Sequence, residues 1–321
     1  MRHGDSGDAV RELQETLQRL GYELPRWGAD GHLGNETFDA LKDFARDHMT
    51  RWPVVVPPDV LAAVEREGAA LGSRDTLEPP PTPWEPPVGV QRFDMRGEMP
   101  EPQGKARVRQ GRTVLRSARA VTGIVIHQTA TPFSVSSDMI RQAGGDADLA
   151  LRMRVQGRLE PLRRPVACHG MVFRRGWAVL TRPLRSYVYH GNGLNSSTLG
   201  IEFEGRYPGL EDDPSTATLE HMKTTWGGKP QDVTDELVAA GRELLAWMVA
   251  EGRAEGMPIQ WIYAHRQSSA DRRSDPGSEL WRRIVLEFAV PELGLETRPQ
   301  MTTGDGAPIP LEWDPAGKGH Y

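Results

Sequence analysis

Cysteine is almost absent from the sequence, since Cys168 is the only one among 321 residues. One cysteine cannot form a disulfide within the chain, so the fold does not depend on an oxidising compartment. Long apolar runs are missing as well, because no segment approaches the roughly 18 apolar residues of a membrane-spanning helix. The first ten residues, MRHGDSGDAV, have no apolar core of the secretory type. We therefore expect a protein made in the cytoplasm without a signal peptide and without membrane insertion.

Several enzyme signatures are also missing. The sequence contains no G-x-S-x-G nucleophile elbow and no G-x-x-x-x-G-K-[ST] phosphate loop. The segment GNGLNS, residues 191–196, lacks the third glycine of a dinucleotide-binding loop. The chemistry must therefore be sought in other residues.

Charge is nearly balanced overall but not along the chain. The net charge is -5, yet the segment from Lys105 to Arg185 contains sixteen basic and four acidic residues. Such asymmetry favours attraction to an anionic polymer, which leaves nucleic acid, a membrane surface and the bacterial wall as alternatives. Scattered, solvated arginines explain the same composition.

Proline divides the chain into units. Eight prolines lie between Pro79 and Pro102, in PPPTPWEPP and the residues that follow, which is typical of a stiff linker. We expect a small N-terminal module over 1–72, a linker over 73–118, a larger domain over 119–292 and a tail over 293–321. The tail has no apolar periodicity, which predicts poor order. The insertion at 207–229 gives no sign of its role.

The N-terminal module has the pattern of three short helices. Apolar residues recur at helical spacing from Val10 to Leu20, from Phe38 to Ala45 and from Val60 to Val64. The stretches GDSGDAVRELQETLQRLGY and DGHLGNETFDALKDF resemble the peptidoglycan-binding module of wall hydrolases. The resemblance implies a three-helix bundle that binds bacterial peptidoglycan, although a bundle without a ligand has the same apolar pattern.

The larger domain mixes strands with a long helix. VTGIVIH and IQWIYAH are apolar, β-branched runs that each end in histidine, and LGIEFEG alternates so that Glu202 and Glu204 share one face. VACHGMVF and WAVLTRPL favour a hairpin, and residues 233–252 form an amphipathic helix. Strands mixed with helices predict an α/β domain.

Two histidines and an aspartate have the composition of a catalytic metal site. His127 and His265 close predicted strands, and ligand sites in open α/β sheets gather at the carboxyl ends of strands. Asp275 follows ten residues after His265. Two imidazoles and one carboxylate suit zinc and leave a fourth position for water.

This constellation is similar to the zinc-dependent N-acetylmuramoyl-L-alanine amidases, to which peptidoglycan recognition proteins are related. IVIHQTA, YAHRQ and SDPG match the motifs of the zinc ligands, which are His127, His265 and Asp275 here. GIEFEG matches the strand whose glutamate, here Glu202, acts as general base. The resemblance covers about residues 121–290 and implies a mixed central sheet flanked by helices.

The remaining site predictions follow from the same resemblance. Arg273 stands where many relatives carry lysine and is expected to stabilise an oxyanion. His169, His190 and Glu204 are predicted to contact substrate, with Glu204 also in reserve as the base. Cys168 replaces a tyrosine of some relatives, and adjacent strand residues point to opposite faces, so it cannot pair with His169 as nucleophile and base. We interpret it as an inert thiol.

The sequence therefore predicts a zinc amidase that cleaves between muramic acid and L-alanine of the stem peptide. Its partner is bacterial peptidoglycan rather than nucleic acid. Two alternatives remain, a noncatalytic peptidoglycan recognition protein and a cytosolic amidase that recycles muropeptides. A cytoplasmic chain acting on the wall needs a lysis pore or a secretion machine, which fits a phage endolysin or an injected toxin.

Overall fold

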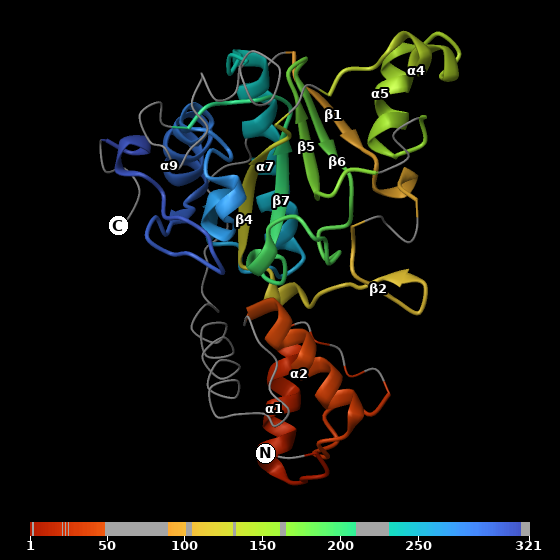
Figure 1. Cartoon of the computed structure of the whole chain (residues 1–321), viewed down its shortest axis with the longest axis vertical. Helices are drawn as coiled ribbons and strands as arrows, with labels where there is room; N and C mark the ends of the chain where they lie inside the picture. Colours follow the sequence, from red (N-terminus) through yellow and green to blue (C-terminus); the bar gives the residue numbers. More distant parts are fainter. Residues whose placement is uncertain are drawn as a thin grey trace.

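The computed structural model describes residues 1, 3–20, 22, 24, 26–48, 89–100, 105–130, 133–160, 165–209 and 231–315. Two helices, α1 (Asp8–Arg19) and α2 (Asn35–His48), lie together at one end of the molecule (Figure 1). They share a small apolar core that includes Leu17, Leu41 and Phe44. These are the first two helices that the sequence predicts. The third predicted helix falls outside the described residues.

The larger domain is built on a seven-stranded sheet in the order β1-β6-β5-β7-β4-β8-β9. The strands are β1 (Gln91–Asp94), β4 (Gly123–Gln128), β5 (Gly170–Phe173), β6 (Trp177–Leu180), β7 (Thr198–Phe203), β8 (Trp261–Ala264) and β9 (Glu296–Thr297). Within this sheet β5 and β6 pair antiparallel, and the other neighbours pair parallel. The predicted mixed α/β sheet is confirmed.

Helices lie on both faces of this sheet, since α5 and α7 pack against alternate residues of β5 and β6. The helical segments of the domain are α4 (Ser137–Gln142), α5 (Ala147–Val155), α7 (Asp235–Ala254), α8 (Ser278–Leu280), the π-helical η6 (Trp281–Ala289) and α9 (Val290–Leu293). The long helix α7 starts where the Thr234 hydroxyl accepts a hydrogen bond from the Leu237 amide, and it packs across β5, β6 and β7 (Figure 1). Gly241 permits close packing, because a Cβ there would lie 2.4 Å from the Phe203 ring.

The face of the central strands opposite α7 carries the polar residues. Side chains alternate along a strand, so Ile126 and Ile201 pack in the core with α7, while His127 and Glu202 point to the other side. β4 and β7 are parallel neighbours in a register that pairs His127 with Glu202. The sheet therefore brings both side chains to one place.

The structure corrects the predicted linker and tail. Residues 91–94, inside the predicted linker, form the edge strand β1, and the exposed hairpin β2 (Val108–Arg109) and β3 (Arg112–Thr113) follows. In the predicted tail, β9 extends the sheet beside β8, and Trp313 is buried. The prediction of poor order in the tail is wrong for the residues up to 315. Most of the predicted insertion lies outside the described residues.

Candidate functional site

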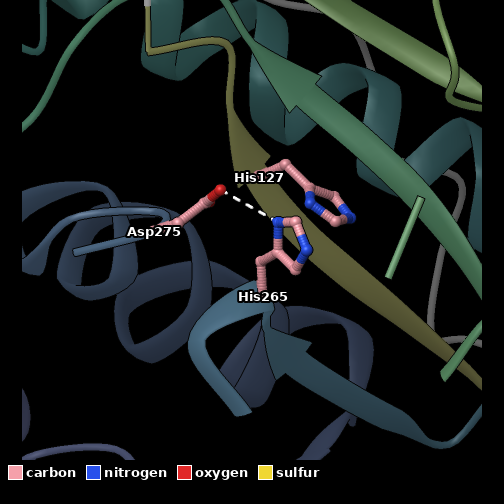
Figure 2. Close-up of side chains that lie close together, drawn as sticks. All are labelled: His127, His265 and Asp275. Atoms are coloured by element: carbon pink, nitrogen blue, oxygen red, sulfur yellow. Dashed lines mark hydrogen bonds and ion pairs between the residues drawn. The ribbon is translucent and has the colours of Figure 1, made fainter. Parts of the chain in front are cut away.

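Three side chains predicted to bind a metal meet at the carboxyl ends of β4 and β8 (Figure 2). His127 lies within β4, and His265 begins the short 3-10 helix η4 (His265–Ser268) directly after β8. Asp275 is held beside them, since its Oδ1 accepts a hydrogen bond of 2.9 Å from the Gln128 amide. Their potential ligand atoms all lie within 4.8 Å of one another.

The contacts within this cluster leave a ligand atom available. His265 Nδ1 lies 3.0 Å from Asp275 Oδ2, and the His127 and His265 ring centroids are 4.4 Å apart. His127 Nδ1 is buried and has no hydrogen-bond partner among the residues that the structure describes. A buried nitrogen without a hydrogen-bond partner, beside an imidazole and a carboxylate, fits the role of a metal ligand. The donor set, two nitrogens and one oxygen, suits a transition metal such as zinc.

Burial keeps His127 neutral. The pKa of His127 lies well below its usual value because burial disfavours the imidazolium and because the other basic groups around it, His265 first, add repulsion. A neutral imidazole offers the lone pair that a metal needs. The electrostatics of His127 therefore agree with a ligand role.

Glu202 has the environment of an acid-base residue. Burial raises its pKa to about 8, the charge of Asp275 adds to this effect, and Arg272 and Lys105 oppose it. Its Oε2 is buried without a hydrogen-bond partner within the described part of the chain. A carboxyl group with a pKa near neutrality can both accept and release a proton, which is what general acid-base catalysis requires.

Arg272, the neighbour of the predicted Arg273, acts electrostatically on the site. The charge of Arg272 lowers the pKa values of both His127 and Glu202. The backbone carbonyl of Arg273 accepts a hydrogen bond from the Arg266 side chain, and the oxyanion role of Arg273 stays a prediction. The motif alignment selects Arg273, and only the fold distinguishes these two neighbours.

His190 lies against the metal cluster rather than on an open surface. Its Nδ1 is 3.1 Å from His127 Nε2, and only 8% of the residue is exposed. Its Nε2 lies 3.2 Å from the Thr198 carbonyl oxygen. Both ring nitrogens are engaged within the protein, so the predicted contact with substrate does not match its surroundings.

His169 is a structural residue. It is wholly buried, its Nδ1 accepts a hydrogen bond of 3.0 Å from the Gly200 amide, and its Nε2 donates to the Ser186 carbonyl at 2.8 Å. With both nitrogens bonded to backbone groups, the ring ties β7 to the loop before it. The prediction that His169 contacts substrate is therefore corrected.

Glu204 holds two loops in place. Its two carboxylate oxygens accept hydrogen bonds from the backbone amides of Phe133, at 2.8 Å, and Arg174, at 3.0 Å. These bonds occupy the carboxylate, so the geometry offers no support for a second base. Contact with substrate by Glu204 stays a prediction.

A buried arginine that no sequence motif singles out supports this region. Arg116 lies in the predicted linker and is 1% exposed. Its guanidinium donates to the carbonyl oxygens of Leu184, Asn195 and Thr198 at 2.9, 2.9 and 2.6 Å. Burial lowers its pKa to about 10. Arg116 thus clamps the chain segment that leads into β7.

Cys168 is the inert thiol that the sequence predicts. The residue is fully buried, and burial raises the pKa of its thiol to about 12. The thiolate needed for nucleophilic attack is therefore scarce at neutral pH.

Comparison with known proteins places two segments of the chain. Residues 117–278, about half of the chain, match the sequence model of the family described as N-acetylmuramoyl-L-alanine amidase. Residues 6–49 match a peptidoglycan binding domain. Within the described part of the chain, no helix is long and apolar enough to cross a membrane.

Individual relatives share short stretches. The chain is 34% identical over 74 residues to the N-acetylmuramoyl-L-alanine amidase CwlL of Bacillus licheniformis, covering 23% of this chain and 19% of that protein. It is 40% identical over 47 residues to the type VI secretion system spike protein VgrG3 of Vibrio cholerae, covering 15% and 5%. The matches thus span about a fifth or less of these relatives. The solved amidase LysC of Clostridium intestinale aligns over 64% of this chain and 99% of its own, with 13% identity and a TM-score of 0.35.

Proposed function

The chain belongs to the N-acetylmuramoyl-L-alanine amidase family, and we propose that it hydrolyses the amide bond between N-acetylmuramic acid and L-alanine in bacterial peptidoglycan. The observation that carries this proposal is the cluster of His127, His265 and Asp275 with Glu202 beside His127 on the same face of the sheet. We propose zinc as the metal, because the donor set and the family both favour it.

The metal cluster, Glu202 and an arginine each have a separate proposed role in amide hydrolysis. A zinc ion bound at the cluster would act as a Lewis acid and make water nucleophilic near neutral pH. Glu202 would take the proton from the attacking water and deliver it to the leaving amine. Arg273, as predicted, or Arg272, as the electrostatics favour, would stabilise the negative charge that develops on the carbonyl oxygen.

The reaction is tested by mass analysis of the fragments released from purified sacculi. We expect stem peptides with a free L-alanine amino group, and glycan strands whose lactyl groups end in carboxylates. Release of disaccharide peptides would indicate cleavage of the glycan instead. Binding without any released fragment would favour the noncatalytic recognition protein.

Removal of the metal is expected to abolish hydrolysis. A chelator should reduce the release of fragments to background, and added zinc should restore it, because water is a poor nucleophile without a Lewis acid. Thiol alkylation serves as the control and should change little, since Cys168 is buried. Full activity in a protein shown to be metal-free would contradict a zinc mechanism.

We propose that residues 1–72 bind peptidoglycan and hold the catalytic domain near its polymer. Residues 6–49 support this, since they match a peptidoglycan binding domain. Deleting 1–72 should weaken binding to sacculi and slow their digestion more than the hydrolysis of small muropeptides, because only a polymer benefits from tethering. An equal loss on both substrates would argue that the module supports the fold instead.

The route to the wall stays a prediction. One of the relatives is named as a spike protein of a type VI secretion system, so delivery by a secretion machine joins release through a lysis pore as a proposal. Detection of the protein outside intact cells, with and without each machinery, would distinguish the two routes.

A further inference from the structure

His190 connects the metal cluster to the backbone of β7 through two hydrogen bonds. One ring nitrogen, Nε2, lies 3.2 Å from the Thr198 carbonyl oxygen, and the other, Nδ1, lies 3.1 Å from His127 Nε2. The rings of His127 and His190 meet nearly edge to face, with an angle of 84° between their planes. The ring of His190 thus forms a bridge from a fixed carbonyl group to a metal-cluster histidine.

The chemistry of the partners decides which atoms carry hydrogen. A carbonyl oxygen can only accept, so His190 Nε2 must be the nitrogen that bears hydrogen. In a neutral ring Nδ1 is then an acceptor, and the hydrogen between the two rings belongs to His127 Nε2. His127 Nδ1 is left without hydrogen, and this is the atom that is buried without a partner within the described part of the chain.

We propose that His190 is a positioning residue that holds His127 in the tautomer whose Nδ1 lone pair is free for a metal ion. The proposal deepens the proposed function, because it rests on the same metal site, and it assigns His190 a role other than the substrate contact predicted from sequence. Outer hydrogen bonds of this kind fix the tautomer and orientation of metal ligands.

The surroundings of His190 fix its ring. The Asn195 side chain accepts hydrogen bonds from the backbone amides of His190 and Gly191 at 2.8 and 2.7 Å. The ring packs on Gly200 so closely that a Cβ there would lie 2.7 Å from it. Neither the backbone nor the ring can turn away from His127 without breaking these contacts.

Arg116 favours the neutral form of His190. Its guanidinium donates to the same Thr198 carbonyl oxygen, at 2.6 Å, so a second positive charge on the His190 ring would lie close to a buried cation. Two buried like charges repel strongly in a medium of low dielectric constant. The Thr198 carbonyl oxygen thus accepts hydrogen bonds from both Arg116 and His190, which holds the His190 ring in place. Arg116 lies one residue before the start of the family match.

The tautomers can be read directly by ¹⁵N-edited NMR of the imidazole rings in the zinc-free, full-length protein. We expect the Nε2–H form for both His127 and His190. An Nδ1–H form of His127 would overturn the proposal. This measurement needs neither zinc nor hydrolysis, so it remains valid even if the protein proves not to be an amidase.

A matched pair of variants tests the consequence for metal binding. His190→Asn keeps an acceptor where Nδ1 stands, whereas His190→Leu has the same branching at Cγ without an acceptor, and both lose the bond to Thr198. Zinc affinity, measured by competition with a chromogenic chelator, should fall roughly 10- to 100-fold in His190→Leu. It should stay within about threefold of the wild type in His190→Asn if the acceptor is what matters.

Thermal unfolding of the zinc-free variants serves as the control for folding. The two variants should unfold at similar temperatures, because they lose the same contact with Thr198. Equal zinc affinities in the two variants would overturn the proposal. If His190→Leu does not fold, the NMR measurement on the wild-type protein decides the matter.

Discussion

Replacing Asp275 by alanine is expected to abolish zinc binding and hydrolysis together. The substitution removes one of the three proposed metal ligands and also the two hydrogen bonds that the carboxylate accepts, from the Gln128 amide and from His265 Nδ1. Loss of an outer partner alone typically weakens metal binding 10- to 100-fold, so loss of a ligand should weaken it by roughly 10² or more. Zinc content after dialysis and turnover on muropeptides measure the two effects.

Two further variants show whether the effect comes from the ligand or from the fold. Asp275→Asn keeps an oxygen for the Gln128 amide and removes the negative charge, so it should fold like the wild type and still lose zinc. Asp271→Ala removes an exposed carboxylate four residues earlier, outside the cluster, and should leave zinc content and turnover unchanged. An Asp275→Ala protein that held zinc normally would show that the spacing from His265 marks only a strand end and a turn.

The cluster could be predicted from the sequence because its residues lie in strongly patterned local segments. β4 is fully buried, and its apolar run is followed by His127 and Gln128, so the histidine stands out at the end of the run. β8 has the same pattern and is followed directly by His265. A histidine at the end of a strand says little by itself, and these positions became informative because two such histidines and Asp275 together match the motifs of the zinc amidases.

Other features depended on partners that the sequence does not reveal. β1 has mostly exposed side chains and becomes a strand only because it pairs with β6, and β9 is two residues long. His169 is predicted to contact substrate, but both of its ring nitrogens are bonded to backbone groups. The choice between Arg272 and Arg273 likewise depends on how one short turn is oriented. Such features follow from tertiary packing rather than from local pattern.

Replacing Glu202 by glutamine should separate catalysis from metal binding. Glutamine keeps the shape of the side chain but cannot accept the proton from water, and the ligand atoms are untouched. We expect turnover to fall on the order of 10² to 10⁴, with zinc content and binding to sacculi near wild-type values. Glu204→Gln is the matched control, because the same substitution two residues away alters a carboxylate bonded to backbone amides. A Glu202→Gln enzyme with the wild-type rate would place the general base elsewhere.

The same variant should reveal the environment of Glu202 in the zinc-free protein through the pH dependence of stability. Burial raises the pKa of Glu202 from 4.5 to about 8, so the folded state binds this proton more tightly than the unfolded state does. The wild type should therefore lose stability as the pH rises from about 4.5 through about 8, a loss that Glu202→Gln, which stays neutral, should not share. Denaturant unfolding at pH 5, 7 and 9 measures the difference, which should grow in favour of the variant. If the free energy of unfolding depended on pH in the same way in both proteins, Glu202 would be solvated in solution. Its pKa would then not be raised by burial, and this support for its role as general base would be lost.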